Sequence, residues 1–265
     1  MRTSILGRAR ALRATIRLQL TQQRRRLAAA RGGAAAASGD AAAAAAAAPP
    51  AVAAPQPAAV ISRDVVAEGR FLRLVDLQYT RPPRSDVPRQ WQAVERCTTA
   101  RGGGAHGIDA VAVFAVVKSS SRPPQLVVVK QFRPPLGMMT VELPAGLVDD
   151  GEDPQETALR ELREETGFTA SRVLGTGGRQ FLSPGLTNEN IVTVFVEVDG
   201  DALEGGAPAP QALEEDETIE VALLPLGPGL APALAELEGA GHGVWVGLHA
   251  LAQGMGLGAM YGLPL

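Results

Sequence analysis

The sequence has a single cysteine among its 265 residues, Cys97. One cysteine excludes an internal disulfide framework and is typical of a protein from a reducing compartment. The side chain fits a small buried apolar residue better than a nucleophile. No apolar run reaches the roughly 20 residues that a membrane-spanning helix needs. We therefore expect no membrane partner.

The first part of the chain lacks lysine, and it contains no acidic residue before Asp40. Its nine arginines are interspersed with Ile5, Leu12, Ile16 and Leu20. An arginine-rich, acid-poor amphipathic N-terminus is typical of a mitochondrial or chloroplast transit peptide. The Ala-, Pro- and Gly-rich sequence that follows predicts a flexible spacer.

We therefore predict that residues 1–59 are disordered and form an organelle transit peptide and linker. A disordered tail without a targeting role, in a cytosolic or nuclear protein, is the alternative. The nine arginines and Asp40 account for much of the chain's charge balance: without them, 16 of the 25 basic and 27 of the 28 acidic residues remain. Such an acidic body argues against nucleic acid as a partner.

Residues 60–265 have the pattern of one α+β domain. Short β-type runs at 70–77 and 90–96 are joined by a Pro-rich turn. Near-continuous apolar runs at 110–117 and 126–130 predict buried central strands. Further strands are predicted at 140–143, 172–174, 191–198 and 218–224, loops at 183–190 and 199–217, and helices at 230–237 and 244–253.

The most informative stretch is 146–168, GLVDDGEDPQETALRELREETGF. Asp153 can cap a helix, Pro154 suits its first position, and Glu156 completes a capping box. Gly167 is a natural stop because glycine accepts a left-handed backbone. The stretch therefore predicts a helix between Asp153 and Gly167.

This helix has an apolar arc next to an acidic one. The apolar arc is Ala158, Leu159, Leu162 and Thr166, and the acidic arc is Glu161, Glu164 and Glu165. Carboxylates on one face repel each other unless a hard divalent cation lies among them. The alternative is a solvated acidic face partnered by Arg160 and Arg163.

The full spacing, G-x5-E-x7-R-E-L-x-E-E-x-G-F, resembles the Nudix box at every fixed position. The resemblance implies Mg²⁺, with Mn²⁺ as an alternative, held by the three carboxylates of the acidic arc and by the carbonyl of Ala145. It also implies that Arg160 orients these carboxylates and that Glu164 is catalytic. Glu152 is expected to pack, or to pair with an arginine near the helix start.

Outside the box, VKQFRPP at 129–135, ELPAG at 142–146 and Pro184 are similar to the ADP-ribose and ADP-sugar pyrophosphatase branch. This branch implies an α/β/α sandwich around a mixed sheet, with an extra N-terminal β-region at 60–105 that serves dimerisation and base binding. It also implies a homodimer that exchanges N-terminal strands.

The same resemblance implies five substrate-binding residues. Trp91 lines up with an adenine-stacking Trp, and Phe71 lies where a second Trp is expected; ordinary core packing is the alternative for both. Arg96 and Arg133 match phosphate-binding positions, since a guanidinium fork suits phosphate oxygens. Leu147, beside the first box glycine, is the fifth.

In this branch the general base lies outside the box, on the loop before a late strand. Glu217 lines up with it, although Glu214, Glu215 and Asp216 crowd the same loop and leave the register open. A solvated loop acid is the alternative for Glu217.

The sequence thus predicts Mg²⁺-dependent hydrolysis of the diphosphate in ADP-ribose and related ADP-sugars to AMP and a sugar phosphate. ADP-glucose, a UDP-sugar or an oxidised nucleoside diphosphate are alternative substrates. A non-catalytic nucleotide-sensing module would be a different class of protein. That class predicts lost carboxylates, and none is lost here.

Overall fold

The computed structural model describes residues 58–261 except 82–83, 98–106, 204–206 and 216. The predicted transit peptide and most of the predicted linker lie outside the described residues. Within them, no helix is long and apolar enough to cross a membrane.

A nine-stranded mixed sheet forms the centre of the described domain, with the main order β12-β6-β5-β4-β10-β8. β10 runs parallel to β4, and most other neighbours are antiparallel. Strands β7, β9 and β11 pair with β4, β10 and β5 off this path. The strands are β4 (Ala110–Lys118), β5 (Gln125–Arg133), β6 (Met138–Glu142), β7 (Ala145–Leu147), β8 (Arg172–Thr176), β9 (Gln180–Phe181), β10 (Asn190–Asp199), β11 (Ile219–Pro225) and β12 (Gly243–Val244).

Strands β4 and β5 pair only near one end, through Val116 with Leu126 and Val117 with Gln125. Beyond that end β4 pairs with β7, while β5 pairs with β6 and β11. The two central strands therefore separate, and the β6–β7 segment that leads into the next helix lies at this separation.

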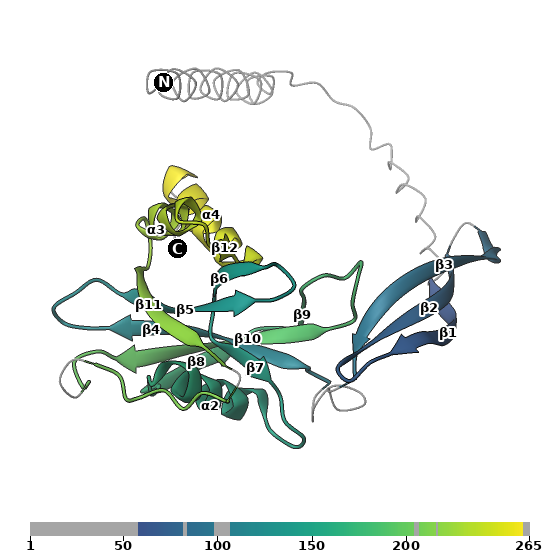
Figure 1. The fold of residues 1–265 in the computed structure, drawn as a ribbon. Coiled ribbons are helices and arrows are strands. Elements are labelled where there is room, and N and C mark those ends of the chain that lie inside the picture. The colour runs from purple at the N-terminus through teal and green to yellow at the C-terminus, as the bar shows by residue number, and fades with distance from the viewer. Residues whose placement is uncertain (1–57, 82–83, 98–106, 204–206, 216, 262–265) are drawn as a thin grey trace, which may run out of the picture. The chain divides into compact units, whose positions relative to one another are not determined.

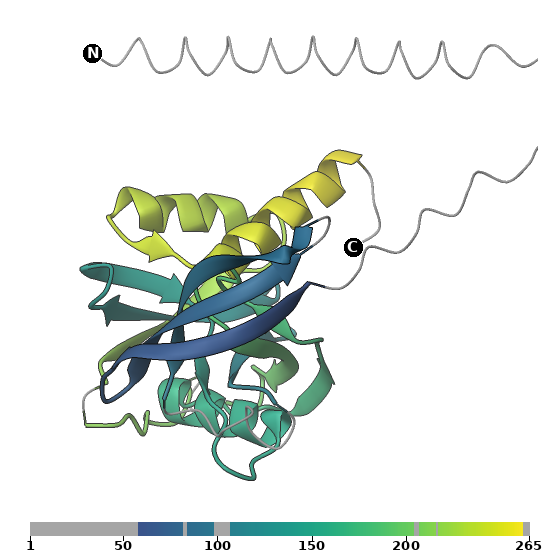
Figure 2. The same cartoon turned by 90° about the vertical axis from the view of Figure 1, so that its right-hand side faces the viewer.

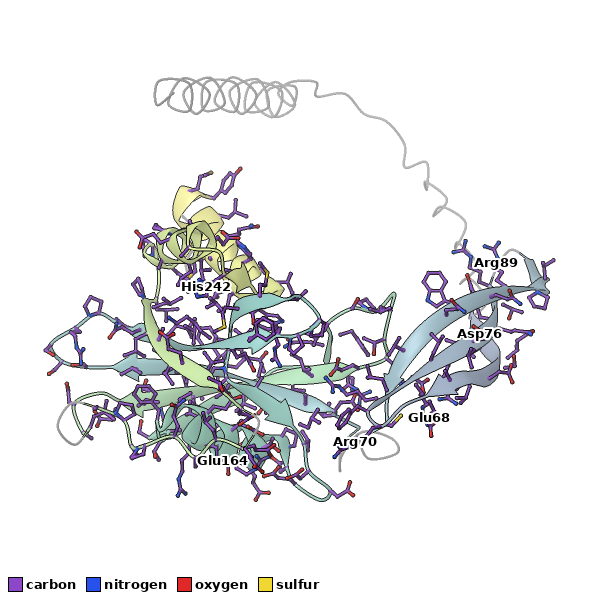
Figure 3. The ribbon with its side chains drawn as sticks, in the orientation of Figure 1. Glu68, Arg70, Asp76, Arg89, Glu164 and His242 are labelled. Carbon is purple, nitrogen blue, oxygen red and sulfur yellow. The ribbon has the colours of Figure 1, made fainter. Side chains whose placement is uncertain are left out.

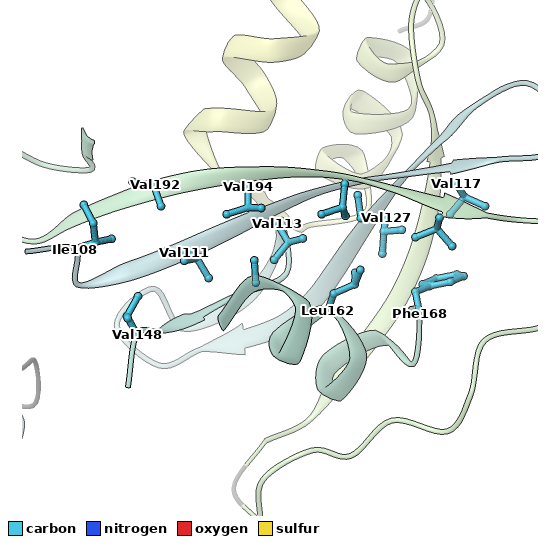
Figure 4. Packing of buried hydrophobic residues seen from close by; sticks show 14 residues of the cluster. Ile108, Val111, Val113, Val117, Val127, Val148, Leu162, Phe168, Val192 and Val194 are labelled. Atoms are coloured by element: carbon cyan, nitrogen blue, oxygen red, sulfur yellow. The ribbon is translucent and has the colours of Figure 1, made fainter. Parts of the chain in front are cut away.

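Helices cover both faces of the sheet (Figure 1). Helix α2 (Pro154–Thr166) packs on one face, while α3 (Leu230–Gly239) and α4 (Val246–Tyr261) pack on the other. Figure 4 shows the first core, in which Leu162 and Phe168 meet valines of β4 and β10. The second core contains Leu234 and Leu248. This is the predicted sandwich, and continuous apolar strands are what two covered faces require.

A separate antiparallel sheet, β1-β2-β3, forms the N-terminal β-region (Figure 2). Its strands are β1 (Ala59–Glu68), β2 (Leu72–Arg81) and β3 (Arg84–Arg96). The sheet joins the body through the β9–β10 loop, where Val94 N–H donates to the Leu186 carbonyl at 2.8 Å.

Two details differ from expectation. Leu159 belongs to the predicted apolar arc of α2, but it is 38% exposed. Glu165 belongs to the predicted acidic arc, yet it is only 3% exposed. The buried arc is therefore shifted toward Thr157 and Glu165. Helix α4 also continues through its Gly-rich end to Tyr261, and Met255 in this extension packs against the second core.

Candidate functional site

Both ends of α2 are fixed by local interactions, as predicted. Asp153 Oδ1 accepts from Gln155 N–H at 2.8 Å, and Glu156 Oε2 accepts from Asp153 N–H at 3.3 Å. At the other end Gly167 has φ 72°, and a Cβ there would lie 1.8 Å from the Ala209 carbonyl oxygen. These two limits set the rotation of the helix and hence the direction of its carboxylates.

Arg160 lies at the centre of the acidic face of α2. Its guanidinium donates to both Glu152 oxygens at 3.0 Å, to Glu161 Oε1 at 2.8 Å and to Glu164 Oε2 at 3.1 Å. The hydrogen bond with Glu152 is the main reason that the pKa of Arg160 is raised and that of Glu152 is lowered. Glu152, which precedes α2, thus pairs with an arginine as predicted, but the arginine lies in the middle of the helix and not near its start. Arg160 holds three carboxylates in one region (Figure 3 labels Glu164 there).

Strand β7 lies directly against these carboxylates. A Cβ at Gly146 would be 1.8 Å from Glu161 Oε1, so any other residue would displace the Glu161 carboxylate from its present position. Ala145 N–H donates to Glu165 Oε2 at 3.1 Å. Burial raises the pKa of Glu161 and raises that of Glu165 to about 8, and the Ala145 hydrogen bond offsets part of the effect on Glu165.

Glu217 is exposed on the loop just before β11. Its charge adds to burial in raising the pKa values of Glu161 and Glu165, so the structure brings this distant acid to the same region. Its Oε2 accepts from Glu214 N–H at 3.1 Å.

The acidic region fits a divalent cation by the chemistry of its donors. Carboxylate oxygens and a backbone carbonyl are the ligands that Mg²⁺ prefers. A cation would favour the ionised form of Glu165, which burial disfavours. No three His, Cys, Asp or Glu side chains form a ready metal cage in the described part of the chain, and Arg160 holds Glu161 and Glu164 instead.

A cavity of about 340 Å³ adjoins β7 on its other side. Four residues predicted from the sequence line it, namely Arg96, Arg133, Ala145 and Leu147. The cavity lies where β4 and β5 separate. Strand β7 borders both the acidic region and this cavity, which places cation donors beside phosphate-binding arginines.

Both cavity arginines have carboxylate partners that the sequence did not reveal. Arg133 Nε and Nη2 each donate to Glu142 at 2.8 Å, and Thr140 Oγ1 donates to Glu142 Oε1 at 2.6 Å. The hydrogen bond to Glu142 raises the pKa of Arg133. Arg96 forms an ion pair with Glu189 across 93 positions of sequence. The one sequence signal for Glu142 as a site residue is its place in the ELPAG motif.

The two predicted aromatic residues are not core residues, since Trp91 is 49% and Phe71 is 54% exposed. Trp91 Nε1 donates to the Gly185 carbonyl at 3.1 Å. With Pro184, Phe181 and their neighbours, Trp91 lines a second cavity of about 290 Å³. Phe71 lines neither cavity and packs under the Arg70 guanidinium, 4.8 Å from its ring centroid.

The NUDIX domain model matches residues 108–237. The chain is 36% identical over 170 residues to the ADP-ribose pyrophosphatase of Saccharomyces cerevisiae, covering 63% of this chain and 70% of the yeast protein. It is 35% identical over 173 residues to the ADP-sugar pyrophosphatase of Mus musculus, covering 65% and 76%. A crystal structure of an ADP compounds hydrolase shares the fold, with a TM-score of 0.50 and 19% identity over 70% of this chain and 85% of that chain.

Proposed function

The chain belongs to the Nudix hydrolase family, and from this premise we propose that it hydrolyses the diphosphate of ADP-ribose and related ADP-sugars to AMP and a sugar phosphate. The observation that carries the proposal is the arrangement around β7. On one side lie the carboxylates of α2, and on the other lies a cavity with Arg96 and Arg133. Each of the two relatives compared above is named for a substrate of this class.

In this proposal the arginines bind the oxygens of a diphosphate that carries two negative charges. Glu161, Glu164, Glu165 and the Ala145 carbonyl would hold Mg²⁺, with Mn²⁺ as an alternative. The bound cation would neutralise phosphate charge and lower the pKa of a bound water. Arg160 keeps the carboxylates oriented through the hydrogen bonds described above.

Glu217 is our proposed general base. It is exposed, and its charge reaches Glu161 and Glu165. Exposure leaves its side chain able to accept a proton from a water molecule beside the cavity.

Adenine is proposed to stack on Trp91, within the cavity at the β9–β10 loop. Phe71 does not reach this cavity from its own chain. Its proposed part in base binding therefore goes with a homodimer, in which a second chain supplies Phe71.

Carboxylate-to-amide variants test this assignment. Wild-type protein with Mg²⁺ should release AMP from ADP-ribose, and phosphatase-coupled phosphate release measures it. Glu165→Gln should leave almost no turnover, whereas Glu217→Gln should lower kcat by roughly 10²–10⁴-fold.

The neighbouring exposed acids provide the matched controls. Glu214→Gln and Glu215→Gln should keep near-normal kcat. Near-normal hydrolysis by Glu165→Gln would disprove the cation site. Equal rates on ADP-ribose and UDP-glucose would contradict the preference for ADP compounds.

We also propose that residues 1–59 direct import into a mitochondrion or chloroplast, on the charge pattern alone. Imaging a fusion of residues 1–59 to a fluorescent protein tests this, and a diffuse cytosolic signal would remove the proposal.

A further inference from the structure

The C-terminal segment contributes an aromatic wall to the central cavity. Trp245 follows β12 and precedes α4, and it lines the cavity together with Arg133, Glu142 and Ala145. The backbone N–H of Trp245 donates to the Val141 carbonyl at 3.0 Å, which ties this wall to β6. Trp245 lies beyond residues 108–237, so the family match does not assign it.

The position of the indole ring is set by its neighbours. A Cβ at Gly247 would lie 2.0 Å from Cζ3 of Trp245, so the ring rests directly on the first turn of α4. One part of Trp245 packs on the core that contains Leu248, and the rest faces the cavity. Among the described residues the indole N–H has no hydrogen-bond partner, and it is free to serve a ligand.

Trp245 and Trp91 line different cavities and come from different parts of the fold. Trp91 contacts the loop that enters β10, whereas Trp245 follows β12 at the far edge of the main strand order. The central cavity is lined by Trp245 and also by Leu182 and Glu189, which belong to the loop that Trp91 contacts. Trp91 itself lines the neighbouring cavity at that loop. At about 340 Å³ the central cavity has the size of a site for a small ligand.

This arrangement gives each half of an ADP-sugar its own aromatic residue. With adenine on Trp91 and the diphosphate at Arg96 and Arg133, the second sugar extends toward Trp245. We propose that Trp245 is a specificity-determining residue, which packs against the sugar of the phosphosugar half of the substrate. The proposal rests on the proposed function. An indole face suits the apolar C–H face of a sugar ring, and its N–H suits a sugar hydroxyl.

Kinetics with two variants test the assignment. Trp245→Ala should lower kcat/KM for ADP-ribose by about tenfold or more. It should also change the ratio of kcat/KM for ADP-ribose to kcat/KM for ADP-glucose. Gly247→Ala should change the same ratio, because the added Cβ displaces the ring while Trp245 remains. Inhibition by AMP, which carries only the nucleoside half, should keep the wild-type constant in both variants.

The neighbouring residue gives a matched control. Val246 is exposed and does not line the cavity, so Val246→Ala should leave the substrate ratio unchanged. Melting temperatures of the variants identify any loss of folding, and Trp245→Phe then provides a smaller ring in the same place. If wild-type protein does not hydrolyse ADP-ribose, the proposed function fails. If wild-type protein hydrolyses ADP-ribose, but Trp245→Ala and Gly247→Ala keep the wild-type ratio of ADP-ribose to ADP-glucose hydrolysis, only this inference fails.

Fluorescence gives a readout that does not depend on turnover. The sequence has two tryptophans, so Trp91→Phe leaves Trp245 as the only one. In the Trp91→Phe, Glu217→Gln double variant with Mg²⁺, ADP-ribose should change the emission of Trp245 and AMP should not. An equal response to AMP would place Trp245 at the nucleoside half and overturn the proposal. No response to ADP-ribose, at a concentration that raises the melting temperature of this variant and so shows binding, would also overturn it.

Discussion

At the scale of single residues, Glu165 has the most unusual environment among the described acidic groups. Its carboxyl is buried, and burial together with the charges of Glu161 and Glu217 raises its pKa to about 8, against the opposing effect of the Ala145 N–H. A metal-free protein therefore holds this group protonated at neutral pH. Ionising it without a cation requires a buried negative charge next to other carboxylates, which is unfavourable.

This raised pKa predicts how the stability of metal-free protein depends on pH. An unfolded Glu loses its proton near 4.3, whereas folded Glu165 keeps it up to about pH 8. The unfolded state thus binds fewer protons between these values, and the free energy of unfolding falls as pH rises through this window. In EDTA, the melting temperature should fall by roughly 5–10 °C between pH 5 and pH 8 because of this group.

The matched variant isolates Glu165 from the other titrating groups. Glu165→Gln should show a smaller fall over the same range, and Mg²⁺ at pH 8 should raise the melting temperature of the wild type but not of the variant. Parallel curves for the two proteins in EDTA would contradict the prediction.

At the scale of elements, the contact between β7 and α2 sets the geometry of the acidic region. Gly146→Ala should push Glu161 aside, because the new Cβ would lie 1.8 Å from its Oε1. We expect kcat on ADP-ribose to fall by about tenfold or more, as for loss of a supporting contact at a metal site. Circular dichroism should still show a folded protein.

The control is a glycine with free space around it. In Gly178→Ala the new Cβ meets no atom within 4 Å, so this variant should keep wild-type activity. Equal activity of the two variants would contradict the close approach.

Helix α2 could be predicted from the sequence because Asp153, Pro154 and Gly167 act on their own neighbours in the chain. The central strands β4 and β5 could be predicted because burial on two faces leaves continuous apolar runs. Strands β7 and β12 have only three and two residues, too few for any periodicity. The partners of Arg96 and Arg133 depend on contacts between distant segments, which a single sequence does not specify. The cavity wall at Trp245 was missed for the same reason.

At the scale of the whole molecule, the described domain contains two sheets of different character. The nine-stranded sheet is covered by helices on both faces, whereas the three-stranded N-terminal sheet exposes several large apolar side chains. They are Val60, Ile61, Val65, Val66, Phe71, Leu72, Val87 and Trp91. Clustered exposed apolar residues commonly mark an interaction surface, which supports the proposed homodimer.

Two residues of β1 allow the homodimer to be tested without breaking the sheet. Ile61 and Val66 lie at register shifts of the β1–β2 pairing and are 54% and 52% exposed. Wild-type protein should be a dimer by light scattering, and the Ile61→Asp, Val66→Asp double variant should be a monomer, because two charges would be buried at the interface. Its KM for ADP-ribose should rise, since Phe71 of a second chain would no longer reach the adenine.

The control must remove equally exposed apolar side chains elsewhere. Leu257 and Met260 on α4 serve this purpose, and their double replacement by Asp should leave the protein dimeric. A monomeric wild type would refute the homodimer. A β1 variant that stays dimeric would move the interface away from β1. A monomeric variant with unchanged KM would show instead that each chain binds adenine with Trp91 alone, and that Phe71 has no part in the site.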